Sequence, residues 1–308
     1  MNVVALAGGI GAARFLRGLV EVVDPATLTV VANTGDDIIL HGLHVCPDLD
    51  TITYTLGGGV HPEQGWGRQD ETFTVATELR DRYQRPDWFT LGDRDLATHL
   101  VRTEMLRSGA GLSQATEFIA RAWNLPFRLL PMTDDQVTTR IRTTDGQTMH
   151  FQRWWVGDRA QTPVAQVIFD GSDTAKPAPG VLAALQQADL VVLCPSNPVV
   201  SIGTILAVPG IRQALGEVPV VGVSPIVGGA VVRGMADKLL PTIGADVNAA
   251  GVAALYHDFL DGWIIDQADA ASAEGLRHDG LKVAVTDTIM ADIAVTRALA
   301  RTALELVS

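Results

Sequence analysis

The sequence predicts an α/β fold whose sheet is mainly parallel. Short apolar runs rich in valine alternate with longer segments in which apolar residues recur at helical spacing. The short runs are apolar on both faces, which is typical of parallel strands that helices cover on each side. Apolar residues make up 47% of the 308, enough for a large core. We expect one elaborated α/β domain over residues 1–308.

Five runs are predicted to be buried strands, and seven segments are predicted to be helices that pack on the sheet. The strands are VVALA (3–7), LTVVAN (28–33), DLVVLCP (189–195), VPVVGVSP (218–225) and LKVAVTD (281–287). The helices are AARFLRGLVEVV (12–23), DETFTVATELRDRY (70–83), RDLATHLVRTEMLRSG (94–109), LSQATEFIARAWN (112–124), PGVLAALQQA (179–188), VPGIRQALGE (208–217) and TRALARTALELV (296–307).

The segment Val137–Gly157 has a different pattern. It alternates polar and apolar residues and carries the dipeptide Asp145-Gly146, a strong hairpin signal. We interpret it as a small antiparallel hairpin inserted in the α/β domain or placed at its edge, and not as a separate domain.

The composition excludes several classes of protein. The formal net charge is −12, whereas a nucleic-acid-binding protein presents a basic face. The two cysteines, Cys46 and Cys194, form no CxxC pair and no ligand cluster, so a reduced setting is expected. The first residues lack the basic region of a signal peptide, and the longest apolar stretch is broken by Pro, Ser and Gly. We expect a cytoplasmic protein without nucleic-acid or membrane partners.

Three glycines, Gly8, Gly9 and Gly11, stand where the first predicted strand meets the first helix. Such a turn can bind an anion, because backbone N–H groups and the positive end of the helix dipole meet there. No Gly-Lys-Ser/Thr follows, so this is not a Walker loop, and the spacing differs from GxGxxG. A phosphate cradle and a simple tight turn are equal alternatives at this point.

Polar residues follow the second predicted strand in the segment NTGDD. Asn33, Thr34, Asp36 and Asp37 could contact a ligand or could form a turn, since these residue types favour turns.

Two aspartates, Asp48 and Asp50 of PDLDTITY, precede an apolar run with a helical pattern. In an extended or loop conformation, both carboxylates could face one magnesium ion held together with substrate phosphates. Capping of the following helix is the alternative that this segment alone favours, because aspartate is a common N-cap.

The segment LGDRD leads into the predicted helix 94–109. Asp93 or Asp95 could cap this helix, and Arg94 could hold a phosphate or join a surface network with the aspartates. His99 is interpreted as a structural histidine.

Two later strand ends also carry polar turns. CPSNPVVSIG places Ser196 and Asn197 after one strand, and VSPIVGG places Ser224 and Gly228 after another. In an open α/β sheet, ligands bind at the carboxyl ends of the strands. Three strand ends with such turns therefore predict a ligand crevice.

Seven motifs occur in a specific order along the chain. They are AGGIGAARF, NTGDD, PDLDTITY, WFTLGDRDLATH, LLPMTDD, CPSNPVVSIG and VSPIVGG. As an ordered set they closely resemble the 2-phospho-L-lactate transferase family (CofD-like), and the tail segments HDFLDGWIIDQAD and VTDTIM are similar to it as well. The resemblance covers nearly the whole chain. It implies a Rossmann-like three-layer α/β/α fold, a homodimer, and magnesium as the cofactor.

The resemblance implies a transfer reaction in coenzyme F420 biosynthesis. The terminal ribityl hydroxyl of the deazaflavin FO attacks the phosphorus nearest the lactyl or enolpyruvyl group of a guanosine-diphosphate-linked donor, and GMP leaves. Phosphoryl transfer requires positioning and charge neutralisation, which magnesium between carboxylates and a diphosphate can supply. The sequence does not decide between lactate and enolpyruvate.

The resemblance also implies roles for the candidate residues. Asp50 is expected at the reacting centre, as a magnesium ligand or as the group that orients the FO hydroxyl, with Asp48 as the weaker partner. The glycines would line the phosphate cradle. The other expected binding residues are Asn33, Thr90, Asp93, Arg94, Ser196, Asn197, Ser224 and Gly228; of these, Thr90, Asp93 and Arg94 are expected near FO or the transferred phosphate, and the last four near the guanosine diphosphate.

Two other classes stay open. A related group shares the GGxG start and the PSNP-like turn, and it resembles a sugar-nucleotide-binding regulatory protein without transferase activity. PDLDTITY, LGDRDLATH and the hairpin favour the transferase. A nicotinamide dehydrogenase is disfavoured by the glycine spacing and by the lack of an acid at the end of the second strand itself.

Overall fold

The central feature of the structure, a computed structural model that describes residues 1–278 and 281–307, is a parallel sheet of seven strands. The strand order is β14-β13-β10-β9-β1-β2-β5, and the α/β prediction is confirmed. The bounds are β1 (Val3–Ala7), β2 (Leu28–Ala32), β5 (Arg128–Pro131), β9 (Leu190–Leu193), β10 (Val220–Val223), β13 (Gly262–Asp266) and β14 (Lys282–Thr286). The five predicted strands are β1, β2, β9, β10 and β14.

Strands β5 and β13 do not stand out in the sequence pattern. β5 has four residues and ends at Pro131, and β13 begins at Gly262 and ends at Asp266. Each therefore offers only a short apolar run, which does not distinguish a strand from a loop. Their neighbours decide the outcome, because β5 pairs with β2, and β13 pairs with β10 and β14.

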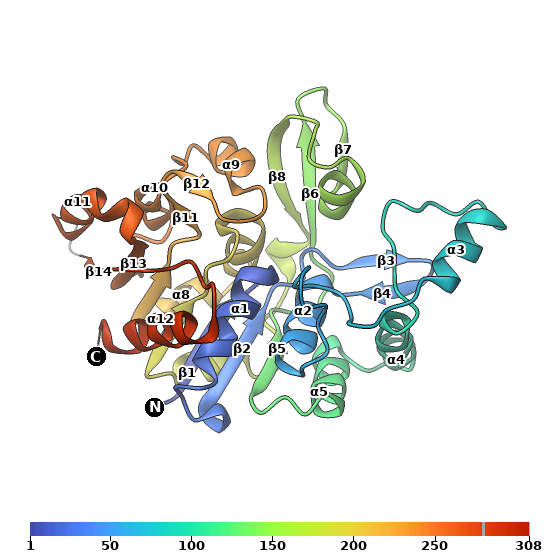
Figure 1. Cartoon of the computed structure of the whole chain (residues 1–308), viewed down its shortest axis with the longest axis horizontal. Helices are drawn as coiled ribbons and strands as arrows, with labels where there is room; N and C mark the ends of the chain where they lie inside the picture. Colours follow the sequence, from blue (N-terminus) through green and yellow to red (C-terminus); the bar gives the residue numbers. More distant parts are fainter. Residues whose placement is uncertain (279–280, 308) are drawn as a thin grey trace.

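Helices cover both faces of the sheet and give three layers (Figure 1). One face carries α1 (Gly9–Leu19), α2 (Pro47–Leu56), α5 (Leu112–Ala122) and α12 (Ile293–Glu305). The other carries α6 (Val181–Gln186), α7 (Gly203–Leu206), α8 (Ile211–Leu215) and α10 (Ala249–Ala254). Successive residues of a strand point to opposite faces, so Val30 belongs to the first core and Val31 to the second.

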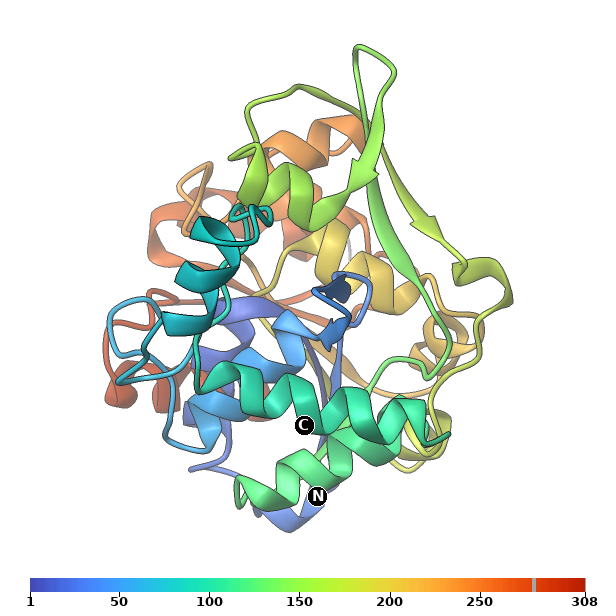
Figure 2. The ribbon, with the colours of Figure 1, turned by 90° about the vertical axis from the view of Figure 1, so that its right-hand side faces the viewer.

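Shorter elements surround these layers. They are α3 (Thr74–Asp81), α4 (Asp95–Arg107), α9 (Ala236–Leu239), α11 (Ala273–His278), β3 (Ile38–Leu40), β4 (Leu43–Val45), β11 (Ile226–Val227), β12 (Ala230–Val231), and the short helical turns η1 (Pro25–Thr27), η2 (Arg153–Gly157), η3 (Ser172–Thr174), η4 (Pro198–Ile202), η5 (Leu240–Ile243) and η6 (Gln267–Ser272). Helices α4 and α5 lie beside each other (Figure 2). Within the described ranges, no helix combines the length and apolar character needed to cross a membrane.

A three-stranded antiparallel sheet projects from the body of the molecule (Figures 1 and 2). Its strands are β6 (Thr138–Thr143), β7 (Thr148–His150) and β8 (Val164–Asp170), in the order β7-β6-β8. The predicted hairpin is confirmed, and Gly146 occupies its turn with φ +87°. The predicted extent to Gly157 is wrong, because residues 153–157 are helical and bury Trp154.

The strand order fixes where a ligand can bind. From β1 the chain proceeds to β2 and then β5 on one side, whereas β9, β10, β13 and β14 follow on the other side. The sheet therefore reverses its winding between β1 and β9. At such a point the loops from neighbouring strands separate, and a crevice opens beyond their carboxyl ends.

Candidate functional site

The candidate site lies at the carboxyl ends of β1, β2 and β9. Helix α1 begins at Gly9, directly after β1, and no side chain caps it. The backbone N–H of Gly8 donates to the Ser196 hydroxyl that follows β9, at 3.2 Å. The remaining N–H groups of the first turn have no intrahelical partner, and the helix dipole adds partial positive charge. This corner therefore suits an anionic group.

The three glycines of this turn serve different purposes. A Cβ at Gly8 would lie 2.6 Å from Ser201 Cβ, and one at Gly11 would lie 2.2 Å from the Pro195 carbonyl oxygen. These two glycines permit close packing between the turn and the segment after β9. Gly9 instead adopts φ +69°, and a Cβ there would meet only Asp48 Oδ1, at 3.8 Å. The lack of a side chain at Gly9 therefore keeps the space beside the turn open, and its positive φ angle favours glycine.

Alanine substitutions should separate these two roles. Gly11→Ala is expected to lower the free energy of unfolding by about 3 kcal/mol, because a backbone carbonyl blocks the new Cβ. Gly9→Ala should cost about 1–2 kcal/mol of backbone strain and should weaken GDP binding. Urea denaturation and calorimetry with GDP would measure both effects. Equal losses of stability in the two variants would contradict this assignment.

A pair of buried carboxyl groups, Asp36 and Asp48, lies beside this turn. They are only 5% and 7% exposed. Burial raises the pKa of Asp48 to about 6, although a hydrogen bond from Asn33 opposes the rise. Burial and the charge of Asp48 together raise the pKa of Asp36 well above its ordinary value. The two carboxyl groups therefore resist being ionised together, and a bound cation would favour their ionised forms.

Asn33 organises this acidic pair. Its amide nitrogen donates to Asp48 Oδ2 at 2.9 Å, and its amide oxygen accepts from the Gly35 N–H at 2.9 Å. Asp36 Oδ1 is buried and has no hydrogen-bond partner among residues 1–278 and 281–307. A buried carboxylate oxygen without a partner is costly, so this atom is a candidate ligand for a hard cation.

Asp48 and Asp50 do not face one another. Both lie in the first turn of α2, whose N-cap position is Cys46. The extended conformation expected for PDL is therefore wrong, and neither aspartate is the N-cap. Two residues apart on a helix, their side chains point about 160° apart, toward opposite sides of the helix. The expectation that both could hold one cation through an extended segment consequently loses its structural basis.

Asp50 points instead toward α4 and forms a buried ion pair with Arg102. Arg102 Nη1 lies 3.1 Å from Asp50 Oδ2, and Nη2 donates to the other carboxylate oxygen. Burial alone would lower the pKa of Arg102, but the Asp50 charge raises it above its usual range. His99 Nδ1 lies 3.6 Å from Asp50, and Arg102 also donates to the His44 carbonyl. This contact fixes the first turn of α2 against α4.

The buried network continues along α4. His99 Nε2 lies 3.1 Å from Asp95 Oδ2, and Asp95 Oδ1 accepts from the Tyr54 hydroxyl at 2.6 Å. The helical spacing of Asp95, His99 and Arg102 places all three on one face of α4. The structural interpretation of His99 agrees with this geometry. Sequence reasoning did not identify Arg102 as the partner of Asp50, although this spacing was a signal for it.

The hydrogen-bond and ion-pair partners of Thr90, Asp93 and Arg94 lie in α3 and in the segments around it. Asp93 accepts from the Thr74 and Val75 N–H groups, each at 2.9 Å, so it caps the start of α3. These bonds, that from Val75 first, lower the pKa of Asp93 to about 2. The prediction that Asp93 or Asp95 caps the helix at 94–109 is wrong for both, because the N-cap position of α4 is Arg94 and no side chain caps this helix.

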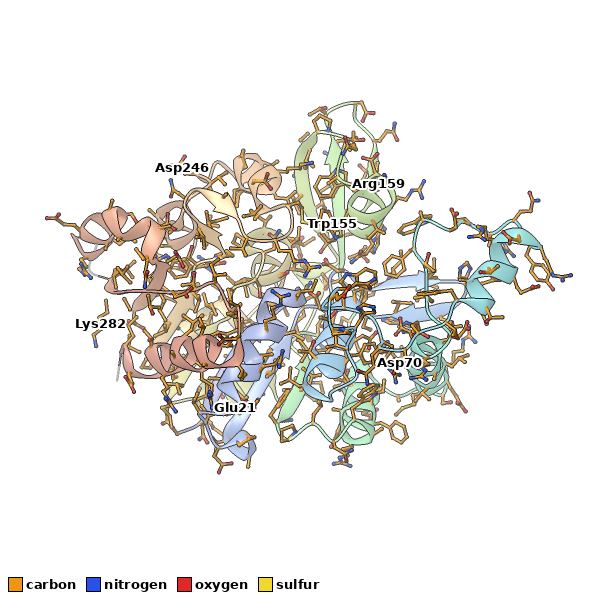
Figure 3. The ribbon with its side chains drawn as sticks, viewed as in Figure 1. Glu21, Asp70, Trp155, Arg159, Asp246 and Lys282 are labelled. Atoms are coloured by element: carbon orange, nitrogen blue, oxygen red, sulfur yellow. The ribbon has the colours of Figure 1, made fainter. Side chains whose placement is uncertain are left out.

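Arg94 is exposed, and its Nη1 lies 4.0 Å from Asp70 Oδ2. Asp70 lies on the side of the molecule that carries α3 and α4 (Figure 3). Thr90 is exposed too, and its hydroxyl donates to the Asp87 carbonyl at 3.4 Å. The structure thus groups these residues with α3, and it groups Gly8, Ser196 and Asp48 with one another.

The turns after β9 and β10 are held by their own side chains. Asn197 Oδ1 accepts from the Val199 N–H at 2.9 Å and so caps η4. The Ser224 hydroxyl donates to the Ile226 carbonyl at 2.8 Å. Gly228 adopts φ +58°, and its N–H donates to Asp269. Ser196 is thus the residue of this group that contacts the β1 turn, while the others shape the adjoining loops.

The chain is similar to known proteins over nearly its whole length. A family model described as "2-phospho-L-lactate transferase CofD" matches residues 3–303. A protein of Kitasatospora aureofaciens named "Phosphoenolpyruvate transferase" is 54% identical, with 99% of this chain and 98% of that protein covered. Proteins of the same name from Streptomyces griseus and Thermobifida fusca are 55% and 53% identical, with the same coverage.

A solved structure has the same fold. It is a member of the UPF0052 family from Bacillus halodurans, with a TM-score of 0.66 and 17% identity, covering 99% of this chain and 98% of its own. At this low identity the likeness concerns the fold alone.

Proposed function

Since the chain belongs to the 2-phospho-L-lactate transferase (CofD) family, we propose that it transfers a phosphoenolpyruvyl group from a guanosine-diphosphate-linked donor to the ribityl hydroxyl of FO. The family and the names of its relatives support a phosphoenolpyruvate or 2-phospholactate transferase. GMP is the leaving group in this proposal. Enolpyruvate is preferred over lactate because relatives with 53–55% identity carry the name phosphoenolpyruvate transferase.

The observation that carries the proposal is the position of the acidic pair beside the uncapped start of α1. Asp48 Oδ1 lies within contact distance of a Cβ built on Gly9, and Gly8 is linked to Ser196. A diphosphate at the α1 N-terminus would meet backbone N–H groups on one side and the carboxylates on the other. Carboxylates beside a diphosphate require a cation between them.

The donor set fits magnesium. Asp36 Oδ1 is buried without a partner in the described part of the chain, and Asp48, whose charge acts on Asp36, would supply a second oxygen ligand. Hard oxygen ligands together with substrate phosphates are the usual protein environment of this ion. Magnesium would supply neutralisation of the charge that develops on the transferred phosphoryl group.

The chain's own residues would supply positioning. Asn33 would hold the Asp48 carboxylate in orientation through its 2.9 Å hydrogen bond. The N–H groups of the residues that follow Gly9 would bind the diphosphate oxygens, since the Gly9 N–H is directed at the Asp48 carboxylate. Asp50, the residue that the sequence favours at the reacting centre, would act through Arg102 by keeping the first turn of α2 in place. Such positioning is the main requirement of phosphoryl transfer.

Turnover with FO, the purified enolpyruvyl or lactyl donor and magnesium would test the function directly. Mass spectrometry of the product would show a phosphodiester between FO and the three-carbon acid, and would identify the preferred acid. The sugar-nucleotide-binding alternative instead predicts nucleotide binding without any FO product. Absence of product from both donors, with folded protein and magnesium present, would overturn the proposed function.

The proposal also predicts a base preference. GDP is expected to bind at least tenfold more tightly than ADP, because guanine offers a carbonyl acceptor and an amino donor that backbone groups can recognise. The loops after β9 and β10, held by Asn197 and Ser224, are the expected contacts. Calorimetry with GDP and ADP under the same magnesium concentration would measure the ratio. Equal affinities would count against the guanosine-linked donor.

A further inference from the structure

A second group of ligand-type side chains lies on the short β3–β4 hairpin and is not used by the proposed transfer. It consists of Asp37, His44 and Cys46. His44 Nε2 lies 3.1 Å from Asp37 Oδ2, and Cys46 Sγ lies 2.8 Å from the same oxygen. One ligand atom from each residue lies within 4.8 Å of the other two. The sequence-based expectation that the cysteines belong to no ligand cluster is therefore wrong for Cys46.

The hairpin itself brings these residues together. His41 and Gly42 form its two-residue turn with φ +52° and +80°, and Ile38 pairs with Val45. Along a strand, side chains alternate between the two faces, so the residues on either side of a given position both lie on the face opposite to it. His44 and Cys46, which flank Val45, consequently share a face. Asp37 enters this face from the start of β3, so the convergence follows from the register of the hairpin.

One atom of this cluster lacks a partner. The Asp37 side chain is only 9% exposed, and its Oδ1 has no hydrogen-bond partner in the described ranges. Such an atom is costly unless it finds a ligand. The other carboxylate oxygen is shared between the thiol and the imidazole.

We propose that Asp37, His44 and Cys46 form a binding site for a zinc-type divalent ion. One oxygen, one nitrogen and one sulfur ligand match the donor types of zinc, whereas magnesium prefers oxygen ligands alone. Three protein ligands leave a fourth tetrahedral position for water or another ligand. Binding replaces the thiol proton of Cys46 by the metal, and this proton is released to the solvent.

The surrounding charges are compatible with a cation. Arg102 is the nearby positive group, and the buried Asp50 carboxylate neutralises it. Asp36 and Asp48 add negative charge on the side of the proposed magnesium site. The His44 side chain is 26% exposed and provides the route by which an ion can reach the cluster.

Cobalt titration of the untagged full-length protein, after treatment with a chelator, would test this site. Co²⁺ takes the place of zinc and gives a thiolate charge-transfer absorption only when a cysteine is a ligand. One equivalent should produce this absorption, and added Zn²⁺ should remove it. Cys46→Ser should abolish the absorption, and His44→Gln should weaken zinc binding by at least about a hundredfold, the upper end of what the loss of an outer-shell partner costs.

Cys194→Ser is the matched control, because Cys194 is the other buried cysteine and follows β9 rather than the hairpin. It should bind cobalt and zinc as the parent does. His44→Gln keeps the test valid if Cys46→Ser folds poorly, since His44 is partly exposed. A parent protein without the thiolate absorption, or equal zinc affinity in the parent and His44→Gln, would overturn the proposal. The readout is metal binding alone, so it is independent of whether the chain transfers a group to FO.

Discussion

Asp48→Asn is expected to reduce the turnover of the proposed transfer by about a hundredfold to a thousandfold. The substitution keeps the shape of the side chain and its hydrogen bond to Asn33, but it removes one of the two buried charges that would hold magnesium. In the absence of metal, the affinity for GDP should not fall and should rise somewhat, because Gly8, Gly9 and Ser196 are unaltered and one negative charge beside the diphosphate is removed.

The same variant should gain stability, with a definite dependence on pH. The pKa of Asp48 is raised to about 6 in the folded state, above the ordinary value of 3.8 for an aspartate. The folded state therefore binds the proton more tightly, and stability is lost as pH rises from about 4 to about 6. Asparagine removes this loss, so metal-free Asp48→Asn should be up to about 3 kcal/mol more stable than the parent at pH 7. Below pH 4 the difference should vanish.

Steady-state assays across a magnesium titration, together with urea denaturation at pH 4 and pH 7, would measure both effects. Asp173→Asn is the control, since Asp173 is an exposed aspartate on a surface turn. Parental turnover at every magnesium concentration would refute the role of Asp48. A stabilised but inactive variant would show that the carboxylate is retained for function at the expense of stability.

Arg102→Met is expected to lower the free energy of unfolding by about 3–5 kcal/mol. Arg102 is 1% exposed, and its removal leaves the Asp50 carboxylate buried without its cation. The hydrogen bond to the His44 carbonyl is lost as well. Asp50→Asn should cost a similar amount, because it leaves the guanidinium unpaired. The two aspartates therefore differ in their effect on stability: Asp50→Asn should destabilise the protein, whereas Asp48→Asn should stabilise it.

A double-mutant cycle would separate the pair from its surroundings. The variant with both Arg102→Met and Asp50→Asn should be more stable than the sum of the single losses implies, because no buried charge remains unpaired. Arg121→Met is the matched control, since Arg121 pairs with Glu117 on the exposed face of α5 and should contribute little. Urea denaturation would give the four stabilities. Additive losses, or an Arg102 effect no larger than that of Arg121, would contradict the proposal that the Asp50–Arg102 ion pair holds α2 against α4.

The PDLD segment shows where prediction from sequence reached its limit. Its residue types indicated a functional acidic pair, but local patterns left capping and metal binding as alternatives. The structure gives a third arrangement, in which Asp48 and Asp50 lie on one helix and point to different neighbours. The partner of Asp50 is 52 positions away in sequence, and helical geometry alone does not reveal which element will cover that face.

The hairpin around Asp145-Gly146 also shows which features the sequence predicts and which it does not. The Asp145-Gly146 turn was predicted because the backbone angles of such a turn depend on its own residues. The end of β7 at His150, the burial of Trp154 just after it and the pairing of β6 with the distant β8 are tertiary features that the turn residues do not reveal.

The sequence by itself determined the α/β class, five strands of the parallel sheet, and the polar turns at their carboxyl ends. These features follow from apolar periodicity and from turn-forming residues, which act over a few positions. Only the tertiary structure decided that Gly8 and Gly11 serve packing, that the charge of Asp48 acts on Asp36 while Asp50 pairs with Arg102, and that Cys46 joins Asp37 and His44. The reason is physical. Each of these features depends on segments that only folding brings together, as in the charge effect of one carboxyl group on another, the burial of Arg102 and the convergence of side chains on one face of a hairpin. The strength of such interactions depends on distance and burial.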